Sequence, residues 1–124
     1  MKLHLDVGPG QNFFTGYGDG YVAVNQERYE ENLVVTPERV ISDWQPQGIE
    51  GLRAEHFDFV TELAPEIVIL GTGRALRFPS RELLRSLAEA HIGVEVMDTH
   101  AACRTYNILS GEGRRVAAAL LIEK

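Results

Sequence analysis

The stretch that decides the fold is Glu66-Ile67-Val68-Ile69-Leu70-Gly71-Thr72-Gly73, an unbroken apolar run that ends in a glycine turn. Apolar runs of this kind are typical of strands that are covered on both faces. A helical stripe follows at positions 83, 84, 87 and 88, with Ser80 as the expected N-cap, and Val94–Met97 then predicts a second strand. Two strands joined by a helix predict a parallel pair with a right-handed crossover.

The segments outward from this unit supply further elements. Helices are predicted over residues 53–63 and from a cap at Asp98 or Thr99 to Ser110, and Gly93 is expected to end the helix that begins at Ser80. Strands are predicted at 2–5, 21–24, 33–36, 39–41 and 116–122, although three alanines leave a helix possible for the last. Glycine clusters at 8–10 and 16–20 predict turns.

Together these elements predict an α/β protein. We expect a single domain over residues 1–124, with a mixed central sheet with helices packed on it and a β-rich N-terminal third.

Composition limits the function classes. The chain has 124 residues and a net charge of −6, which argues against a nucleic-acid module and against docking on an anionic membrane. No apolar run approaches the roughly 20 residues of a membrane span, and Met1–Asp6 lacks the features of a signal peptide. A single cysteine excludes an internal disulfide and suits a reducing compartment. These observations predict a cytoplasmic protein without an integral membrane segment.

The first candidate motif is the glycine turn itself, Gly71-Thr72-Gly73-Arg74-Ala75-Leu76. It follows a strand, and Asp98 ends the next strand, as a dinucleotide fingerprint would require. However, Leu76 stands where the third glycine should be, and Phe78-Pro79 delays the helix. A tight turn at the sheet edge is therefore favoured over nucleotide binding.

The second candidate is the pair His100 and Cys103, which share a helix face and suggest a nucleophile or half of a metal site. The remaining histidines show no spacing that would complete a zinc site. We interpret Cys103 as buried packing and His100 as a solvated side chain. No Ser/His/Asp order, HExxH, CxxC or Walker motif is present, so we predict no catalytic residue, metal or cofactor.

Arginines and aromatic residues form two further groups. The arginines at 74, 77, 81, 104, 114 and 115 suit an anion clamp, but pairing with Glu82, Glu89 and Glu112 on a solvated face is the commoner arrangement. The aromatic residues Phe13, Phe14, Tyr17 and Trp44 are expected in the core rather than in an exposed patch.

Most of the candidate binding residues are expected at one edge of the predicted sheet. Two loops leave it, Gly71 to Arg74 and Asp98 to Arg104, because both follow strand ends of one βαβ unit. We expect a crevice there that binds a partner or a ligand, formed by Gly71, Thr72, Gly73, Arg74, Asp98, Thr99 and Arg104. The two glycines would keep side chains out of the opening, and Asp98 and Thr99 would cap the following helix.

Several blocks carry a family resemblance: residues 65–73, 93–99, 104–109 and 112–120. They resemble the small domain-of-unknown-function family that includes mitochondrial complex I assembly factor 3 and the adipogenesis-associated proteins. The resemblance implies a three-layer α/β fold around a mixed sheet. It also implies an assembly-factor-like role with a protein partner, and it carries over no catalytic residues. Because no complete catalytic constellation is visible, we predict a non-enzymatic interaction or assembly module. The alternative is a small-ligand protein or enzyme that uses the crevice for an anion or a nucleotide.

Overall fold

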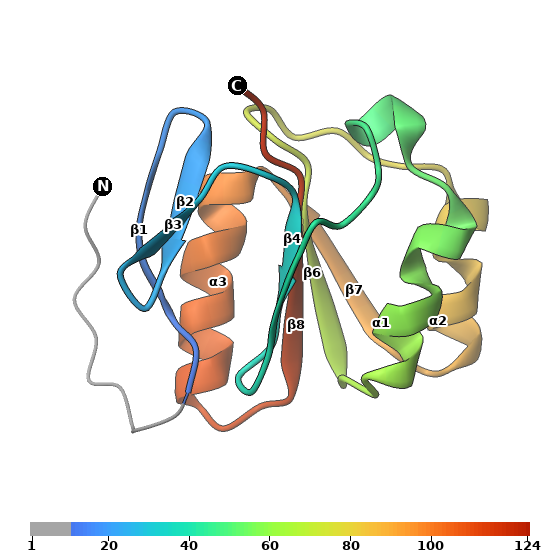
Figure 1. Cartoon of the computed structure of the whole chain (residues 1–124). Helices are drawn as coiled ribbons and strands as arrows, with labels where there is room; N and C mark the ends of the chain where they lie inside the picture. The colour runs from blue at the N-terminus through green and yellow to red at the C-terminus, as the bar shows by residue number, and fades with distance from the viewer. Residues whose placement is uncertain (1–10) are drawn as a thin grey trace.

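The computed structural model describes residues 11–124 (Figure 1). The elements in chain order are β1 (Phe14–Gly18), β2 (Tyr21–Val24), β3 (Glu27–Tyr29), β4 (Leu33–Val35), β5 (Val40–Ser42), the 3₁₀ helices η1 (Ile49–Gly51) and η2 (Ala54–Phe57), α1 (Asp58–Glu62), β6 (Ile67–Gly71), the 3₁₀ helix η3 (Arg81–Leu84), α2 (Arg85–Glu89), β7 (Gly93–Met97), α3 (Thr99–Gly111) and β8 (Val116–Leu120).

The central sheet is mixed and has the strand order β5-β4-β8-β6-β7. Strand β6 pairs in parallel with β7 on one side and with β8 on the other, while β4 runs antiparallel to both β5 and β8. The predicted parallel pair is confirmed. The last segment is a strand rather than a helix, and it lies in the middle of the sheet.

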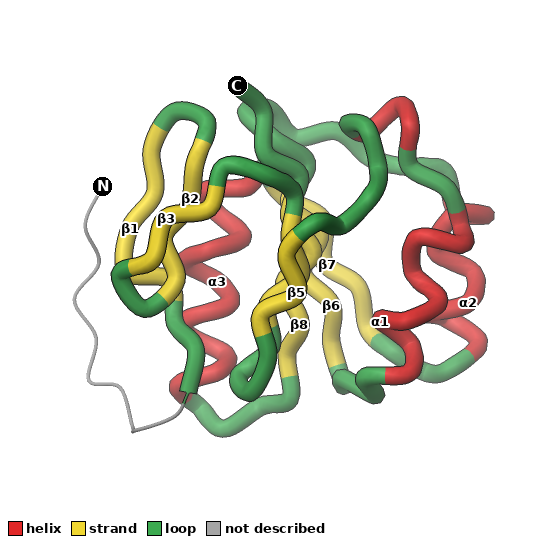
Figure 2. Tube along the Cα trace, viewed as in Figure 1, coloured by secondary structure: helices red, strands yellow, loops and turns green. Residues whose placement is uncertain are grey.

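Both faces of the sheet are covered (Figures 1 and 2). Helix α3 and a small antiparallel sheet, β1-β2-β3, lie on one face, and α1 and α2 lie on the other. Successive residues of β6 therefore enter different cores: Ile69 packs with Phe14 and Tyr106, whereas Val68 and Leu70 pack with Phe57 and Leu87. This two-sided burial explains the unbroken apolar run. The predicted three-layer α/β architecture is confirmed.

Several local predictions are wrong. Residues 16–18 belong to β1 rather than to a turn, so only Asp19 and Gly20 turn the chain. Gly93 does not end the preceding helix but begins β7, and the positive φ of 60° lies two residues earlier at His91. The Ser80 hydroxyl makes no capping hydrogen bond, and the helix after it begins as η3.

Other boundaries differ less. The predicted helix over 53–63 divides into η2 and α1, and β4 ends at Val35. The cap at Asp98 is confirmed, because its Oδ1 accepts a hydrogen bond from the Ala101 N–H at 2.9 Å. The predicted strand at 2–5 and turn at 8–10 lie outside the described residues. Over residues 11–124, no helix has the length and apolar character that crossing a membrane requires.

Candidate functional site

The two loops predicted to converge do meet at the carboxyl ends of β6 and β7. The Thr72 N–H donates to the Met97 carbonyl at 2.9 Å, which extends the parallel ladder by one residue. Beyond it, Gly73 and Thr99 bind each other twice: the Gly73 N–H donates to Thr99 Oγ1 at 2.8 Å, and the Thr99 N–H donates to the Gly73 carbonyl at 2.9 Å. The loops are therefore joined directly, and what they bind stays a prediction.

The chain after β8 crosses this junction. Thr99 Oγ1 donates to the Leu121 carbonyl at 2.7 Å, and the Leu121 N–H donates to the Gly71 carbonyl at 2.9 Å. The Glu123 carboxylate then accepts a hydrogen bond from the Arg74 N–H at 2.6 Å. The Arg74 N–H at the strand end thus binds a carboxylate, and this carboxylate is a side chain of the protein rather than of a ligand.

The two glycines serve this internal packing. A Cβ on Gly71 would lie 2.8 Å from Leu120 Cδ2 and 3.0 Å from Thr99 Cα, which is too close for a side chain. Gly73 has a φ of +99°, and a Cβ there would collide with the Glu123 carboxylate. Gly71 is thus needed because no room is left for a side chain, and Gly73 is needed for its backbone conformation as well.

Little open space remains at this junction. The cavity between the β1–β2 turn, the Gly73 loop and residues 121–123 holds about 30 Å³, room for about one water molecule. The Gly73 and Arg74 amides, which a bound phosphate would need, already donate to Thr99 and Glu123. These contacts do not favour the dinucleotide interpretation of the glycine turn.

The chain beyond Gly73 is exposed but held in place. Thr72 Oγ1 donates to the Ala75 carbonyl at 2.6 Å and accepts from the Arg77 N–H at 3.1 Å. Residues 74–80, which we call the Phe78 loop, leave the sheet from this anchor. Leu76 is 51% exposed and Phe78 is 74% exposed. In the sequence, Leu76 and Phe78 were considered only as departures from a dinucleotide fingerprint, although an apolar pair between a strand and a helix was a signal of an exposed surface.

The Phe78 loop is also basic. Arg74 and Arg77 lie within it, Arg81 follows it, and all three are exposed. Within residues 11–124, no carboxylate lies within 4.0 Å of any of their guanidinium groups. The expected pairing with glutamates is therefore wrong for these arginines. It is also wrong for Arg114, which lies 3.4 Å (Nε to Oε1) from Glu66 rather than beside Glu112.

Two residues of α3 face the small sheet instead of the glycine loop. Arg104 Nη1 donates to the Tyr17 hydroxyl at 2.6 Å. The His100 ring stacks on the Tyr17 ring with centroids 4.3 Å apart, and its Nε2 donates to the Gly18 carbonyl at 3.1 Å. His100 is half-buried rather than fully solvated as expected, because its ring packs on Tyr17 of the β1–β2 hairpin. Arg104 lies on the same helix as Thr99, one turn further along.

Cys103 is fully buried, as predicted. Desolvation raises the pKa of its thiol to about 12, so it is protonated and unreactive near neutral pH. Among residues 11–124, no group of three His, Cys, Asp or Glu side chains is close enough to hold a metal ion.

The aromatic residues proposed for the core are confirmed there: Phe13, Phe14, Tyr17 and Trp44 are all buried. The Trp44 indole keeps its hydrogen bond, since Nε1 donates to the His56 carbonyl at 3.0 Å.

Relatives match most of the chain. The 13 kDa major membrane protein of Francisella tularensis subsp. holarctica (strain LVS) is 30% identical over 111 residues, covering 88% of this chain and 89% of that protein. The human NADH dehydrogenase (ubiquinone) 1 alpha subcomplex assembly factor 3 is also 30% identical over 111 residues, covering 88% of this chain. That match covers 60% of the assembly factor, so this chain spans well under the full length of that relative.

Solved structures share the fold. A crystal structure of a Bordetella parapertussis protein superposes with a TM-score of 0.87 at 43% identity, covering 94% of this chain and 100% of that one. The crystal structure of an outer membrane protein from Bartonella henselae superposes with a TM-score of 0.80 at 27% identity, covering 94% and 98%. The model of one family matches residues 14–121. The chain therefore belongs to the family described as "Protein of unknown function (DUF498/DUF598)".

Proposed function

We propose that this protein is a non-enzymatic interaction module that assists assembly by binding a partner protein through the Phe78 loop. The observation that carries the proposal is the exposure of Leu76 and Phe78 on an anchored basic loop. Relatives named as assembly factors support the class of role. The buried residues of the predicted site, Gly71, Gly73 and Thr99, then act by holding the loop.

The chemistry of the loop indicates the partner surface. Aromatic and arginine side chains dominate the binding energy of many interfaces, because both combine a large contact area with directional contacts. Burying a side chain such as Leu or Phe contributes about 1.5–3 kcal/mol. The Thr72 hydrogen bonds order the loop before binding, which lowers the entropic cost. The partner should present an acidic surface with an apolar pocket.

Paired serine variants test this proposal. The tagged protein is used to capture partners from extracts of its source cells, and each candidate is purified for calorimetry. Phe78→Ser and Leu76→Ser should weaken binding by at least about tenfold without lowering the melting temperature. Ile108→Ser is the matched control, because Ile108 is 62% exposed on α3 outside the loop. Equal affinities for the three variants and the native protein would refute the proposal.

Arginine variants test the wider predicted site. Arg74→Ala should weaken partner binding with little change in melting temperature, because its side chain pairs with no carboxylate of residues 11–124. Arg104→Ala tests whether the surface extends along α3 to the Tyr17 contact. Unchanged binding in both variants would exclude this site as the partner surface.

A small-molecule role for the crevice has less support. Its cavity of about 30 Å³ has room for about one water molecule, and the Arg74 N–H already donates its hydrogen bond to Glu123. A cytoplasmic location is also part of the proposal, supported by the single cysteine, Cys103, which is free. Fractionation of source cells with an antibody to the protein tests the location, and recovery mainly in membranes would contradict it.

A further inference from the structure

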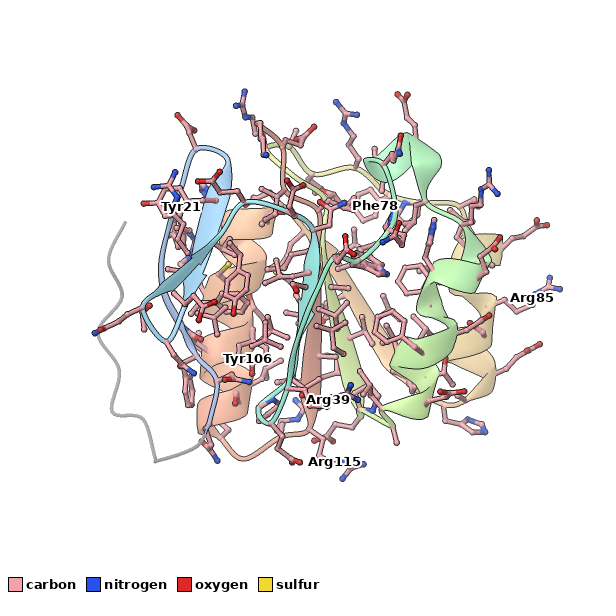
Figure 3. The ribbon with its side chains drawn as sticks, viewed as in Figure 1. Tyr21, Arg39, Phe78, Arg85, Tyr106 and Arg115 are labelled. Carbon is pink, nitrogen blue, oxygen red and sulfur yellow. The ribbon has the colours of Figure 1, made fainter. Side chains whose placement is uncertain are left out.

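A basic cavity lies at the other end of the central sheet, away from the Phe78 loop. Three connections meet there: the β4–β5 turn, the turn before β6 and the connection from α3 to β8. The cavity holds about 240 Å³. Figure 3 shows Arg39 and Arg115 at this end of the molecule and Phe78 at the opposite end. The two surfaces are therefore separate, and this inference does not depend on the proposed function.

The rim of this cavity carries three arginines, Arg39, Arg114 and Arg115. Glu66 engages two of them: its Oε1 lies 3.4 Å from Arg114 Nε and accepts the Arg115 N–H at 3.1 Å. These contacts hold the pKa of the Glu66 carboxyl below its usual value, and the hydrogen bond from the Arg115 N–H is the largest cause. The Glu66 carboxylate therefore pairs with the Arg114 guanidinium, whereas its contact with Arg115 is to the backbone N–H.

The Arg39 guanidinium carries a positive charge that the Glu66 carboxylate does not neutralise. No carboxylate of residues 11–124 lies within 4.0 Å of its guanidinium. Glu38 is the acidic side chain that lines the cavity. The rim therefore has an excess of positive charge, on a protein whose net charge is −6. Such a local reversal of sign favours a small anion.

The wall of the cavity is partly apolar, with Gln11, Thr36 and Ser110 as its uncharged polar side chains. Its apolar part comes from Pro37, Leu63, Pro65 and Val116. Its volume is below the roughly 300–1,000 Å³ of a typical drug-sized site, so the ligand should be small. Arginine binds a carboxylate through two parallel hydrogen bonds, and the wall suits a short hydrocarbon chain.

We propose that this cavity binds a carboxylate attached to a short apolar group, with Arg39 and Arg115 on the carboxylate and the Leu63–Pro65 wall on the apolar part. A free short-chain acid and the carboxyl end of a peptide with an apolar last residue share this chemistry.

The experiment uses N-acetyl-leucine as the probe and N-acetyl-leucinamide as its uncharged match. Binding of each is measured by NMR of the protein's backbone amides. N-acetyl-leucine should shift the backbone signals of Arg39, Gly113 and Val116 in a saturable way, and N-acetyl-leucinamide should not. Arg39→Gln should weaken binding at least about tenfold, since it removes a charged hydrogen-bonding partner. Arg85→Gln is the matched control, because Arg85 is exposed on α2 and does not line the cavity.

Two further probes distinguish the sources. Hexanoate represents a free acid, and an acetylated tetrapeptide ending in leucine represents a peptide carboxyl end. Tighter binding of either one supports the site and names its source. Absence of saturable shifts with all the carboxylates, or equal shifts with the amide, would overturn the proposal. So would equal affinities of Arg39→Gln and Arg85→Gln.

Discussion

The Glu123 carboxylate accepts a hydrogen bond from the backbone N–H of Arg74, 49 residues earlier, at 2.6 Å. This contact closes the edge of the sheet at which ligands of open α/β folds usually bind. Gly73 makes it possible, because a side chain there would occupy the position of the carboxylate. The end of β8 and the Gly73 loop are therefore one structural unit.

Gly73→Val should lower stability by about 1–3 kcal/mol, because a β-branched residue is strained at a φ of +99° and also displaces Glu123. Urea unfolding measures the loss. The double variant Gly73→Ala with Glu123→Ala is the informative control, since it removes the collision but keeps the backbone strain. Unchanged stability of Gly73→Val would show that the loop does not need this conformation.

Thr99→Val should cost about 2–4 kcal/mol. The replacement keeps the shape but leaves the buried Gly73 N–H and Leu121 carbonyl without their shared partner. Thr99→Ser keeps both hydrogen bonds and should recover most of the loss. Thermal unfolding of the three proteins makes the comparison, and a loss for serine as large as that for valine would contradict the role given to the two hydrogen bonds.

Asn107→Ala should detach the small sheet from α3. The Asn107 side chain accepts the Phe14 N–H and donates to the Phe14 carbonyl, each at 2.9 Å, so it takes the place of a neighbouring strand. We expect a loss of about 2–4 kcal/mol. Hydrogen exchange should accelerate more in β1 and β2 than in β6 and β8, and a uniform acceleration would contradict the local role.

Cys103 should make the protein less stable in alkali. Its folded pKa of about 12 exceeds the ordinary value of 9.0, so above pH 9 the unfolded chain loses a proton that the folded chain retains. The unfolding free energy should then fall by up to about 1.4 kcal/mol per pH unit until the folded pKa is reached.

The Cys103→Ala variant tests this slope. Its cost relative to the native protein should shrink between pH 8 and pH 10.5, and its partner binding should be unchanged. Tyr106, whose pKa is also raised by burial, remains in both proteins and cancels from the comparison. A cost independent of pH, or rapid labelling of the native thiol by a bulky reagent, would contradict the buried assignment.

The sequence predicted the part of the fold that local pattern controls. The apolar run at β6 and the capped helix α3 depend on near neighbours, and both are found as expected. The strand β1 was missed, because its two glycines suggest a turn and its pairing with β2 only appears in the folded sheet.

The candidate site was predictable to a similar extent. The convergence of Gly73 and Thr99 follows from the βαβ unit. The occupation of that edge by Glu123 does not, since no local pattern brings together residues 49 positions apart. The cavity at Arg39 was missed for the same reason, because it joins three connections that are distant in sequence.

The central place of β8 has a consequence for how the chain completes its folding. Strands β4 and β6 do not pair with each other, and each has one side that only β8 fills. During synthesis the hairpin β4–β5 and the unit β6–α2–β7 therefore precede the strand that joins them. A peptide of residues 114–124, supplied separately to a chain that ends at residue 113, should restore the fold by insertion. Such split halves would report on any event that brings two fused proteins together.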